Sequence, residues 1–481
     1  MKKEDLFAAL ADIDPISVEK ARAYRGRRTP GWVRWTAAAA CLALLLGAAW
    51  GVRTAVHGGW GGKASPYPAG VTVLEAARPE PVAERLSAGE FMESGERRVW
   101  WTDYRELTDT GADFSHRLDG YSFALLSQVL AGEDENRVCS PLNTYFAFAA
   151  LAEITDGNTR QQLLDLLGAE DLETLRETVS ALWLSNSVDT PVLKSLPAAS
   201  LWLDSSAAYN ADILNTLAEV YRASVFRGVL GSQEMNKAMQ IWTDEHTGDQ
   251  LREYTQGISV NPDTVLELLS TIYYKALWVN PFREEKTTKE TFHGTAGDST
   301  VDMMHRTDVL SAYFGENFTA VSLPLSYSGC MYFLLPEEGT DLNVLLSDPD
   351  LLEPFRGEGR SEWASLTVNL SVPKFRVSGK TDLRRTLANL GVTDVLDMNR
   401  ADFSPLTAEA DWLYLDKAQH AAMLEIDEYG VIGAAYTDLA GASMGVMPKE
   451  TLDFVLDRPF LFFVTARDGS ILFAGAVRNL P

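Results

Sequence analysis

The sequence predicts one large domain of the mixed α/β (α+β) class over residues 112–481. From Phe114 to Pro481, segments with helical spacing of apolar residues alternate with short strand-like runs, and no Pro/Gly-rich stretch interrupts them. The chain is 46% hydrophobic and 23% charged, a composition typical of packed proteins, which excludes a disordered or collagen-like chain. No internal repeat with a period of about 20–50 residues is visible.

Two segments are predicted at the start of the chain, before the linker and the domain. Residues 1–31 are polar, with mixed charges, and are expected to lie in the cytosol; residues 32–52 are predicted to form a transmembrane signal anchor. The uncharged part, Thr36 to Val52, covers about 26 Å as a helix, and the tryptophans and Arg34 before it extend the span to the headgroups. Arginines concentrate before the anchor, so the positive-inside rule places the N-terminus in the cytosol. The predicted localisation is therefore the cell membrane, single-pass, with the domain outside.

Three other interpretations of this apolar segment stay open. It resembles a cleaved signal peptide at Gly47-Ala48-Ala49, in which case the protein would be secreted. A lipoprotein signal would need its apolar run before Cys41, whereas most of the run follows that residue. A buried core helix is the third alternative.

Residues 53–111 are rich in Gly, Pro, Ala and charged side chains and are predicted to be an extracellular linker. A flexible chain of this length has a root-mean-square span of roughly 40 Å. The linker would hold the domain away from the membrane.

Two helices and several strands can be assigned to particular positions within the domain. Tyr121–Leu130 is apolar at helical spacing, and Ser140-Pro141 caps a second helix that continues through Leu151. Strand-like runs are found at 200–203, 271–274, 331–335, 366–372 and 461–464.

Charge and cysteine usage exclude several functions. The net charge is −25, and a chain so acidic repels phosphate backbones, which argues against a nucleic-acid partner. Three cysteines, Cys41, Cys139 and Cys330, cannot form a disulfide framework and lack the paired spacing of a zinc site. With only six histidines, none of them in an H-E-x-x-H motif, we expect no metal and no cofactor.

A series of short motifs runs along residues 112–481: Asn136–Leu142, Gly157–Leu163, Ile272–Trp278, Asn280–Phe282, Val301–Met304, Leu323-Pro324, Leu335-Pro336, Val372–Phe375, Leu390-Gly391, Ala401–Ser404, Lys417–His420, Ile426–Gly430, Asp457–Phe460 and Ile471–Gly475. In kind and in order, these motifs resemble those of the serpin family of serine protease inhibitors. The resemblance implies a large central β-sheet, two smaller sheets, about eight or nine helices and an exposed reactive-centre loop. We expect a bacterial serpin with an N-terminal membrane anchor, since the leader weakly resembles those before the anchor in some bacterial surface proteins.

The resemblance also implies a polar cluster that lets the central sheet part. Its members here are Ser140, Asn143, Ser270 and His420, which we call the central-sheet cluster. Asn143 stands where the family usually has Ser, and Ser270 stands where it usually has Asn. His420 is interpreted as a hydrogen-bonded core residue and not as a catalyst.

The segment between Gly430 and Phe454 corresponds to the reactive-centre loop. In the family a protease cuts this loop, the freed segment inserts into the main sheet as an extra strand, and the acylated protease is trapped. Insertion requires alternate residues to be uncharged and proline to be absent. From Val431 the inward set is uncharged, and no proline occurs before Pro448; the hinge comprises Glu428, Gly430, Val431, Ile432, Gly433, Ala434 and Ala435.

Family spacing places the cleaved bond at Met444–Gly445, within about one residue. Methionine after Ala442 and Ser443 suits chymotrypsin-, elastase- or subtilisin-like proteases. The chain is therefore predicted to be a membrane-tethered suicide-substrate inhibitor, a monomer and not an enzyme. A non-inhibitory serpin serving as a binding or signalling module is the alternative. A hydrolase using Ser443 in Gly441–Gly445 is disfavoured, because no histidine follows His420.

Overall fold

The computed structural model describes residues 66–75, 88–248, 260, 266–349, 351–355, 362–408, 413–431, 448 and 450–481. The chain divides into two compact units, Met1–Pro66 and Tyr67–Pro481, and nearly all described residues belong to the second. The predicted cytosolic segment, the predicted anchor and the predicted loop positions from Ile432 to Gly445 lie outside the described residues.

The predicted localisation as a single-pass membrane protein has to be corrected. Across the part of the chain that the structure describes, no helix combines the length and the apolar character needed to cross a bilayer. The apolar segment 32–52, on which that prediction rested, lies outside the described residues. Membrane attachment therefore has no support in the structure.

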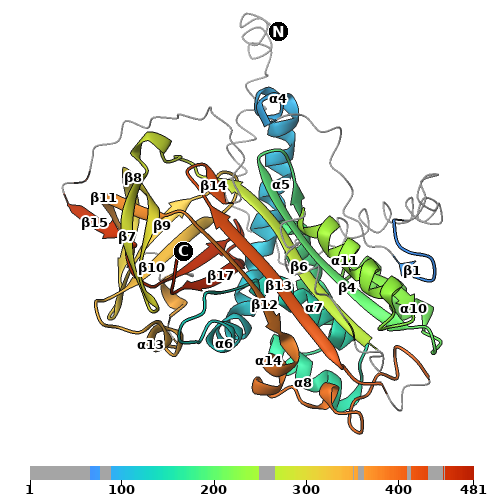
Figure 1. Cartoon of the computed structure of the whole chain (residues 1–481). Coiled ribbons are helices and arrows are strands. Elements are labelled where there is room, and N and C mark those ends of the chain that lie inside the picture. Colours follow the sequence, from blue (N-terminus) through green and yellow to red (C-terminus); the bar gives the residue numbers. More distant parts are fainter. Residues whose placement is uncertain are drawn as a thin grey trace, which may run out of the picture. The chain divides into compact units, whose positions relative to one another are not determined.

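The first sheet contains the strands that position the candidate site (Figure 1). In the described residues it has eight strands, in the order β1-β5-β4-β6-β14-β13-β12, with β3 paired to β4. β4 and β5 are parallel, as are β6 and β13, whereas the other neighbours run antiparallel. The bounds are β1 Thr72–Glu75, β3 Val188–Asp189, β4 Leu193–Asp204, β5 Ala223–Gly228, β6 Leu266–Leu277, β12 Phe375–Asp382, β13 Lys417–Ile426 and β14 Gly430–Val431.

A second sheet has nine strands in the described residues, in the order β15-β11-β8-β9-β10-β16-β17-β2, with β7 paired to β8. The predicted pair of smaller sheets is thus one continuous sheet, because β8 (Gly297–Phe314) is long enough to pair with β7, β11 and β9 along its length. The other bounds are β2 Arg137–Cys139, β7 Thr288–Gly294, β9 Phe318–Pro324, β10 Cys330–Pro336, β11 Ala364–Pro373, β15 Thr451–Val455, β16 Phe460–Thr465 and β17 Ile471–Val477.

Helix α7 (Pro141–Glu153) lies at the centre of the unit and is buried along its entire length. The Ser140 hydroxyl accepts a hydrogen bond from the Asn143 amide and Pro141 opens the first turn, as predicted. Because α7 is apolar on nearly every face, it packs against β17 of one sheet and against β4 and β6 of the other. The mixed α/β fold is confirmed.

The remaining helices surround these sheets. Their bounds are α4 Ala88–Glu93, α5 Gly95–Ser115, α6 Asp119–Val129, α8 Gly157–Leu167, α9 Leu172–Asn186, α10 Ala211–Glu219, α11 Gln233–Thr247, α13 Leu342–Leu346 and α14 Leu383–Asn389. Side-chain caps start several of them, among them Asp171 before α9 and Ser232 before α11. α11 covers part of the first sheet, with Met239 and Trp242 packed on Trp202 and Leu269 in a second, smaller apolar cluster.

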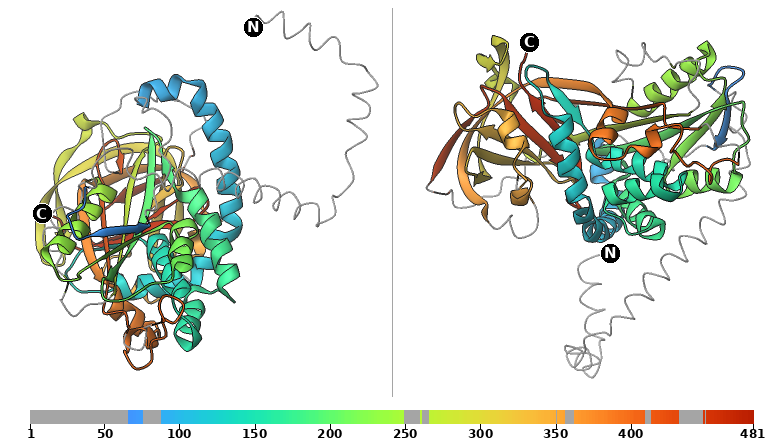
Figure 2. Two further views of the ribbon diagram at one scale, coloured as in Figure 1. Left: turned by 90° about the vertical axis from the view of Figure 1, so that its right-hand side faces the viewer. Right: turned by 90° about the horizontal axis from the view of Figure 1, so that it is seen from below.

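Part of the predicted linker is folded in the structure. Helix α5 is a long helix on the outside of the second unit (Figure 2), and β1 pairs with β5. An aromatic cluster of Trp100, Trp101, Tyr104 and Tyr327 holds α5 to the turn between β9 and β10, with Trp101 and Tyr327 ring centroids 5.1 Å apart. The Arg97 guanidinium donates a hydrogen bond to the Tyr327 hydroxyl at 3.2 Å. The composition of 53–111 indicated a tether because it does not show these distant partners.

Candidate functional site

The candidate site is the line along which β6 and β13 meet, which we call the seam. At one end the two strands pair directly, with Glu267–Thr271 facing Lys417–Ala421 in register. At the other end the two residues of β14 lie between them: Gly430 and Val431 pair with Leu277 and Ala276 of β6, and Val431 also pairs with Ile426 of β13. The first sheet is therefore closed at one end of the seam and already holds the start of an extra strand at the other (Figure 1).

Glu428 anchors the chain just before it enters the seam. Its carboxylate accepts a hydrogen bond from the Thr287 hydroxyl at 2.8 Å and forms an ion pair with the Lys374 ammonium at 2.9 Å. Burial acts to raise the pKa of this carboxyl, but the bonds from Lys374 and Thr287 outweigh it and hold the pKa below its ordinary value. Glu428 is therefore ionised at neutral pH and ties the hinge to the neighbouring strands.

Backbone contacts fix the turn that follows. The Trp278 amide donates to the Tyr429 carbonyl at 2.9 Å, and its indole N–H donates to the Asp427 carbonyl at 2.9 Å. Gly430 passes so close to β6 that a Cβ there would lie 2.1 Å from the Ala276 carbonyl oxygen. A side chain at position 430 would push the hinge out of the sheet, which explains why glycine occupies it.

The structure brings the four members of the central-sheet cluster together beneath the seam. The Ser140 amide donates to His420 Nε2 at 3.0 Å, so this nitrogen carries no proton, and Nδ1–H donates to the Ser270 hydroxyl at 3.2 Å. The Asn143 side-chain amide donates to the same hydroxyl at 2.6 Å. α7 and β2 are thereby linked to β6 and β13, the two strands that form the seam.

Burial sets the protonation state of this cluster. His420 is fully buried, and loss of hydration lowers its pKa to about 4, so it is neutral at physiological pH. The Asn143 side-chain oxygen is buried and has no hydrogen-bond partner in the described part of the chain. The cluster thus has one acceptor that a new donor could satisfy.

The two ends of the loop are fixed in different sheets. Val431 ends β14 in the first sheet, and Thr451 begins β15, which pairs in parallel with β11 in the second. The predicted hinge positions Ile432, Gly433, Ala434 and Ala435 and the predicted bond Met444–Gly445 lie outside the described residues. Among the predicted hinge residues, the structure therefore places only Glu428, Gly430 and Val431.

Sequence reasoning missed three features of the site. Thr287 and Lys374 hold Glu428 but lie far from it in the chain. The Tyr429 hydroxyl donates to a carboxylate oxygen of Glu284 at 2.5 Å, a contact that no local pattern indicates. A detectable signal did exist for Glu267, since it is a single charge within the apolar run Leu266–Leu269.

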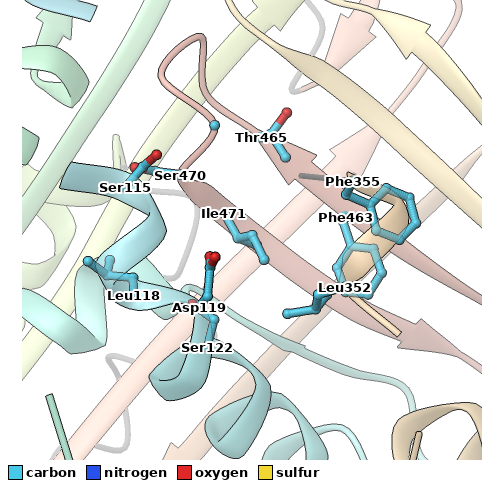
Figure 3. A pocket seen from close by; sticks show the side chains of 11 residues that line it. Ser115, Leu118, Asp119, Ser122, Leu352, Phe355, Phe463, Thr465, Ser470 and Ile471 are labelled. Carbon is cyan, nitrogen blue, oxygen red and sulfur yellow. The ribbon is translucent and has the colours of Figure 1, made fainter. Parts of the chain in front are cut away.

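A small cavity lies apart from the seam, between the start of α6 and the hairpin of β16 and β17. Figure 3 shows Leu118, Asp119, Phe463 and Ile471 around it. Its volume of about 20 Å³ has room for roughly one water molecule. Within the described residues no group of His, Cys, Asp and Glu side chains is arranged to hold a metal ion.

Comparison with known proteins identifies one family. The family model described as "Serpin (serine protease inhibitor)" matches residues 116–480. Serpin-Z2A of Oryza sativa subsp. japonica is 30% identical over 404 residues, covering 73% of this chain and 93% of the relative. A serine protease inhibitor of Cyanea capillata is 27% identical over 363 residues, covering 73% and 94%. Alpha-1-antitrypsin of Sus scrofa is 27% identical over 372 residues, covering 75% and 86%.

Solved structures agree on the fold. The native structure of tengpin, a thermophilic serpin, gives a TM-score of 0.68 at 21% identity, covering 76% of this chain and 94% of that one. Human thyroxine-binding globulin gives 0.69 at 24% identity, covering 77% and 99%. The curated relatives named above come from a plant, a jellyfish and the pig, so they give no support to the expected bacterial origin.

Proposed function

The chain belongs to the serpin family, and from this membership we propose that it inhibits a serine endopeptidase as a suicide substrate. The family and its protease-inhibitor members support serine protease inhibition in general and argue against an enzyme. The observation that carries the proposal for this chain is the position of Gly430 and Val431 between β6 and β13. The first residues of the loop are already paired as strand β14, so after cleavage the loop would only need to lengthen this strand.

The register of these two residues predicts where the rest of the loop would go. Each further residue advances by one position along both neighbouring strands, so Thr437 would meet Ser270 and His420. Ser270 and His420 already face one another across the closed seam, and the two registers therefore agree. The Thr437 hydroxyl would arrive beside the unpartnered oxygen of Asn143 and could donate to it.

The same register supports the predicted alternation of the loop. Ser270 contacts Asn143 of α7, and Ile272, Tyr274 and Ala276 belong to the main core, so this face of β6 points inward. Residues paired with them share that face, which would turn Val431, Gly433, Ala435, Thr437 and Leu439 toward the core. Tyr436 and Asp438 would point to the opposite face, where a ring and a charge cost less.

We place the cleaved bond at Met444–Gly445 and expect a chymotrypsin-, elastase- or subtilisin-like target. About fourteen inserted residues at roughly 3.3 Å each would carry the acylated protease about 46 Å along the sheet. We assign this activity to residues 112–481 acting as a monomer. Insertion would lower the free energy, so the intact form would persist because of a kinetic barrier.

Electrophoresis in SDS tests the proposal. After mixing with chymotrypsin, elastase or subtilisin, we expect a covalent adduct that survives denaturation and a matching loss of protease activity. Met444→Arg keeps the loop length and should transfer adduct formation to trypsin. Clean cleavage of the loop by a protease that stays active would refute inhibition and favour the non-inhibitory alternative.

A further inference from the structure

A buried ion pair crosses the seam at its closed end. Glu267 of β6 and Lys417 of β13 are direct register partners, and the Lys417 ammonium lies 3.4 Å from a Glu267 carboxylate oxygen. The Glu267 side chain has no exposed surface, and that of Lys417 is 21% exposed. Apart from the Lys417 ammonium, no hydrogen-bond donor reaches either Glu267 oxygen in the described part of the chain. The carboxylate therefore depends on Lys417 and lacks the further donors that normally replace lost water.

The surroundings of Glu267 are largely apolar. Its register partner on β4 is Trp202, which packs on Phe226 and on Met239 and Trp242 of α11. The charged groups that act on Glu267 are Lys417 and Asp416 at the start of β13 and Lys380 on β12. Two ammonium groups thus face one carboxylate within a poorly hydrated site.

The pair lies where the sheet must open. β6 and β13 are neighbours here at the ordinary spacing of about 4.8 Å, and a strand placed between them would roughly double that distance. By the register of β14, the loop residue that would separate Glu267 from Lys417 is Ala440, which has no polar side chain to replace either partner. Opening the seam at this level must separate the pair and admit water to the carboxylate.

We propose that Glu267 makes opening of the seam pH-dependent, so that the sheet opens faster above neutral pH than below it. In the closed seam the ionised carboxylate lacks hydration, and parting of the strands restores it. This inference rests on the proposed function, since it concerns the insertion step of the same site.

The direction and size follow from the proton affinity of the closed form. Burial raises the pKa of Glu267 from 4.5 to about 7, although Lys417 and Lys380 act to lower it. The closed seam therefore binds this proton more tightly than the opened seam. The free energy by which the bound proton stabilises the closed seam is lost as pH rises through about 7. If opening returns the carboxyl to its ordinary pKa, opening at pH 8 should be about tenfold faster than at pH 6.

Uptake of a synthetic peptide with the sequence of residues 431–443 measures opening without any protease. The full chain would be incubated with the peptide at pH 6, 7 and 8, and the rate of complex formation followed by the gain in thermal stability. Glu267→Gln keeps the shape and removes the charge, and dividing the wild-type rate by its rate cancels the contribution of other titrating groups, His420 included. We expect this ratio to rise about tenfold from pH 6 to pH 8.

Two further variants sharpen the test. Glu234→Gln removes an exposed carboxylate on α11 and should leave the pH dependence as in the wild type. Lys417→Gln removes the positive charge that attracts the Glu267 carboxylate, and should move the rise in the rate of peptide uptake to higher pH. A ratio that stays constant or falls with pH, while both proteins take up peptide, would overturn the role of Glu267 and leave the proposed function intact. Failure of both proteins to take up peptide at any pH, together with no covalent adduct, would overturn both.

Discussion

Acid should destabilise the intact protein, in which the loop has not inserted into the first sheet, because folding keeps His420 neutral. The ring is buried and neutral, with a pKa of about 4 against an ordinary value of 6.5. Because the unfolded chain binds this proton more tightly, the stability that the neutral ring provides is present above pH 6.5 and is lost as pH falls toward 4. Linkage gives a loss of about 2 kcal/mol between pH 7.5 and pH 5, and about 3 kcal/mol in full.

Urea unfolding of wild type and His420→Gln over pH 4.5–8 would test this magnitude. The wild-type curve alone is not diagnostic, since Glu267 titrates in the opposite sense over part of the range. The difference in unfolding free energy between the two proteins isolates the contribution of the histidine. The glutamine side-chain oxygen can still accept a hydrogen bond from the Ser140 amide. We expect the advantage of wild type over His420→Gln to shrink by about 2 kcal/mol from pH 7.5 to pH 5. A difference that does not change with pH would refute the description of His420 as buried and neutral.

Four other substitutions probe the hinge and helix α5. Glu428→Gln keeps the hydrogen bond from Thr287 but removes the charge that pairs with the half-exposed Lys374, and should lower the free energy of unfolding by about 1 kcal/mol in urea titration. Val431→Arg should turn the inhibitor into a substrate on SDS gels, because position 431 is only 1% exposed. Ile432→Arg should keep adduct formation, because the alternation proposed above would turn position 432 to the opposite face. Trp101→Ala removes a ring that is half-buried against the turn between β9 and β10, and should lower the melting temperature by a few degrees, which calorimetry would detect. Unchanged behaviour of Glu428→Gln, Val431→Arg or Trp101→Ala would contradict the contact assigned to that residue, and loss of adduct formation in Ile432→Arg would contradict the proposed alternation.

Much of the fold was predictable because its signals are local. The cap at Ser140-Pro141 and the apolar run after it determine α7 within a few residues, and strand-like runs such as 461–464 fall inside observed strands. The attachment of α5 was not predictable, because Tyr327 lies 230 positions from Arg97, which bonds to it. The merging of the two smaller sheets depends on the full length of β8, which propensity does not define.

The candidate site was likewise predictable only in part from the sequence. Resemblance to a family singled out the central-sheet cluster and the hinge. The structure brings the members of the central-sheet cluster together from α7, β6 and β13, whereas of the hinge it describes Glu428, Gly430 and Val431. The partners of Glu428 and Glu267 come from other strands, and only the register of the sheet shows that they meet. The alternation along the loop depends on one strand alone and could therefore be predicted from sequence; it stays a prediction, because residues 432–447 lie outside the described residues.

Comparison of the melting temperatures of intact and loop-cleaved protein tests the central claim most directly. The loop would be cut by a metalloprotease, which forms no acyl-enzyme and cannot be trapped. About ten new strand residues would bond to both β6 and β13, while the direct pairing of those two strands would be lost. A net gain of roughly ten bonds or more, at roughly 1 kcal/mol per bond, should stabilise the cleaved form by on the order of 10 kcal/mol. We therefore expect cleaved protein to melt about 20 °C or more above intact protein. Equal or lower melting after cleavage would contradict insertion of the segment that begins at Val431.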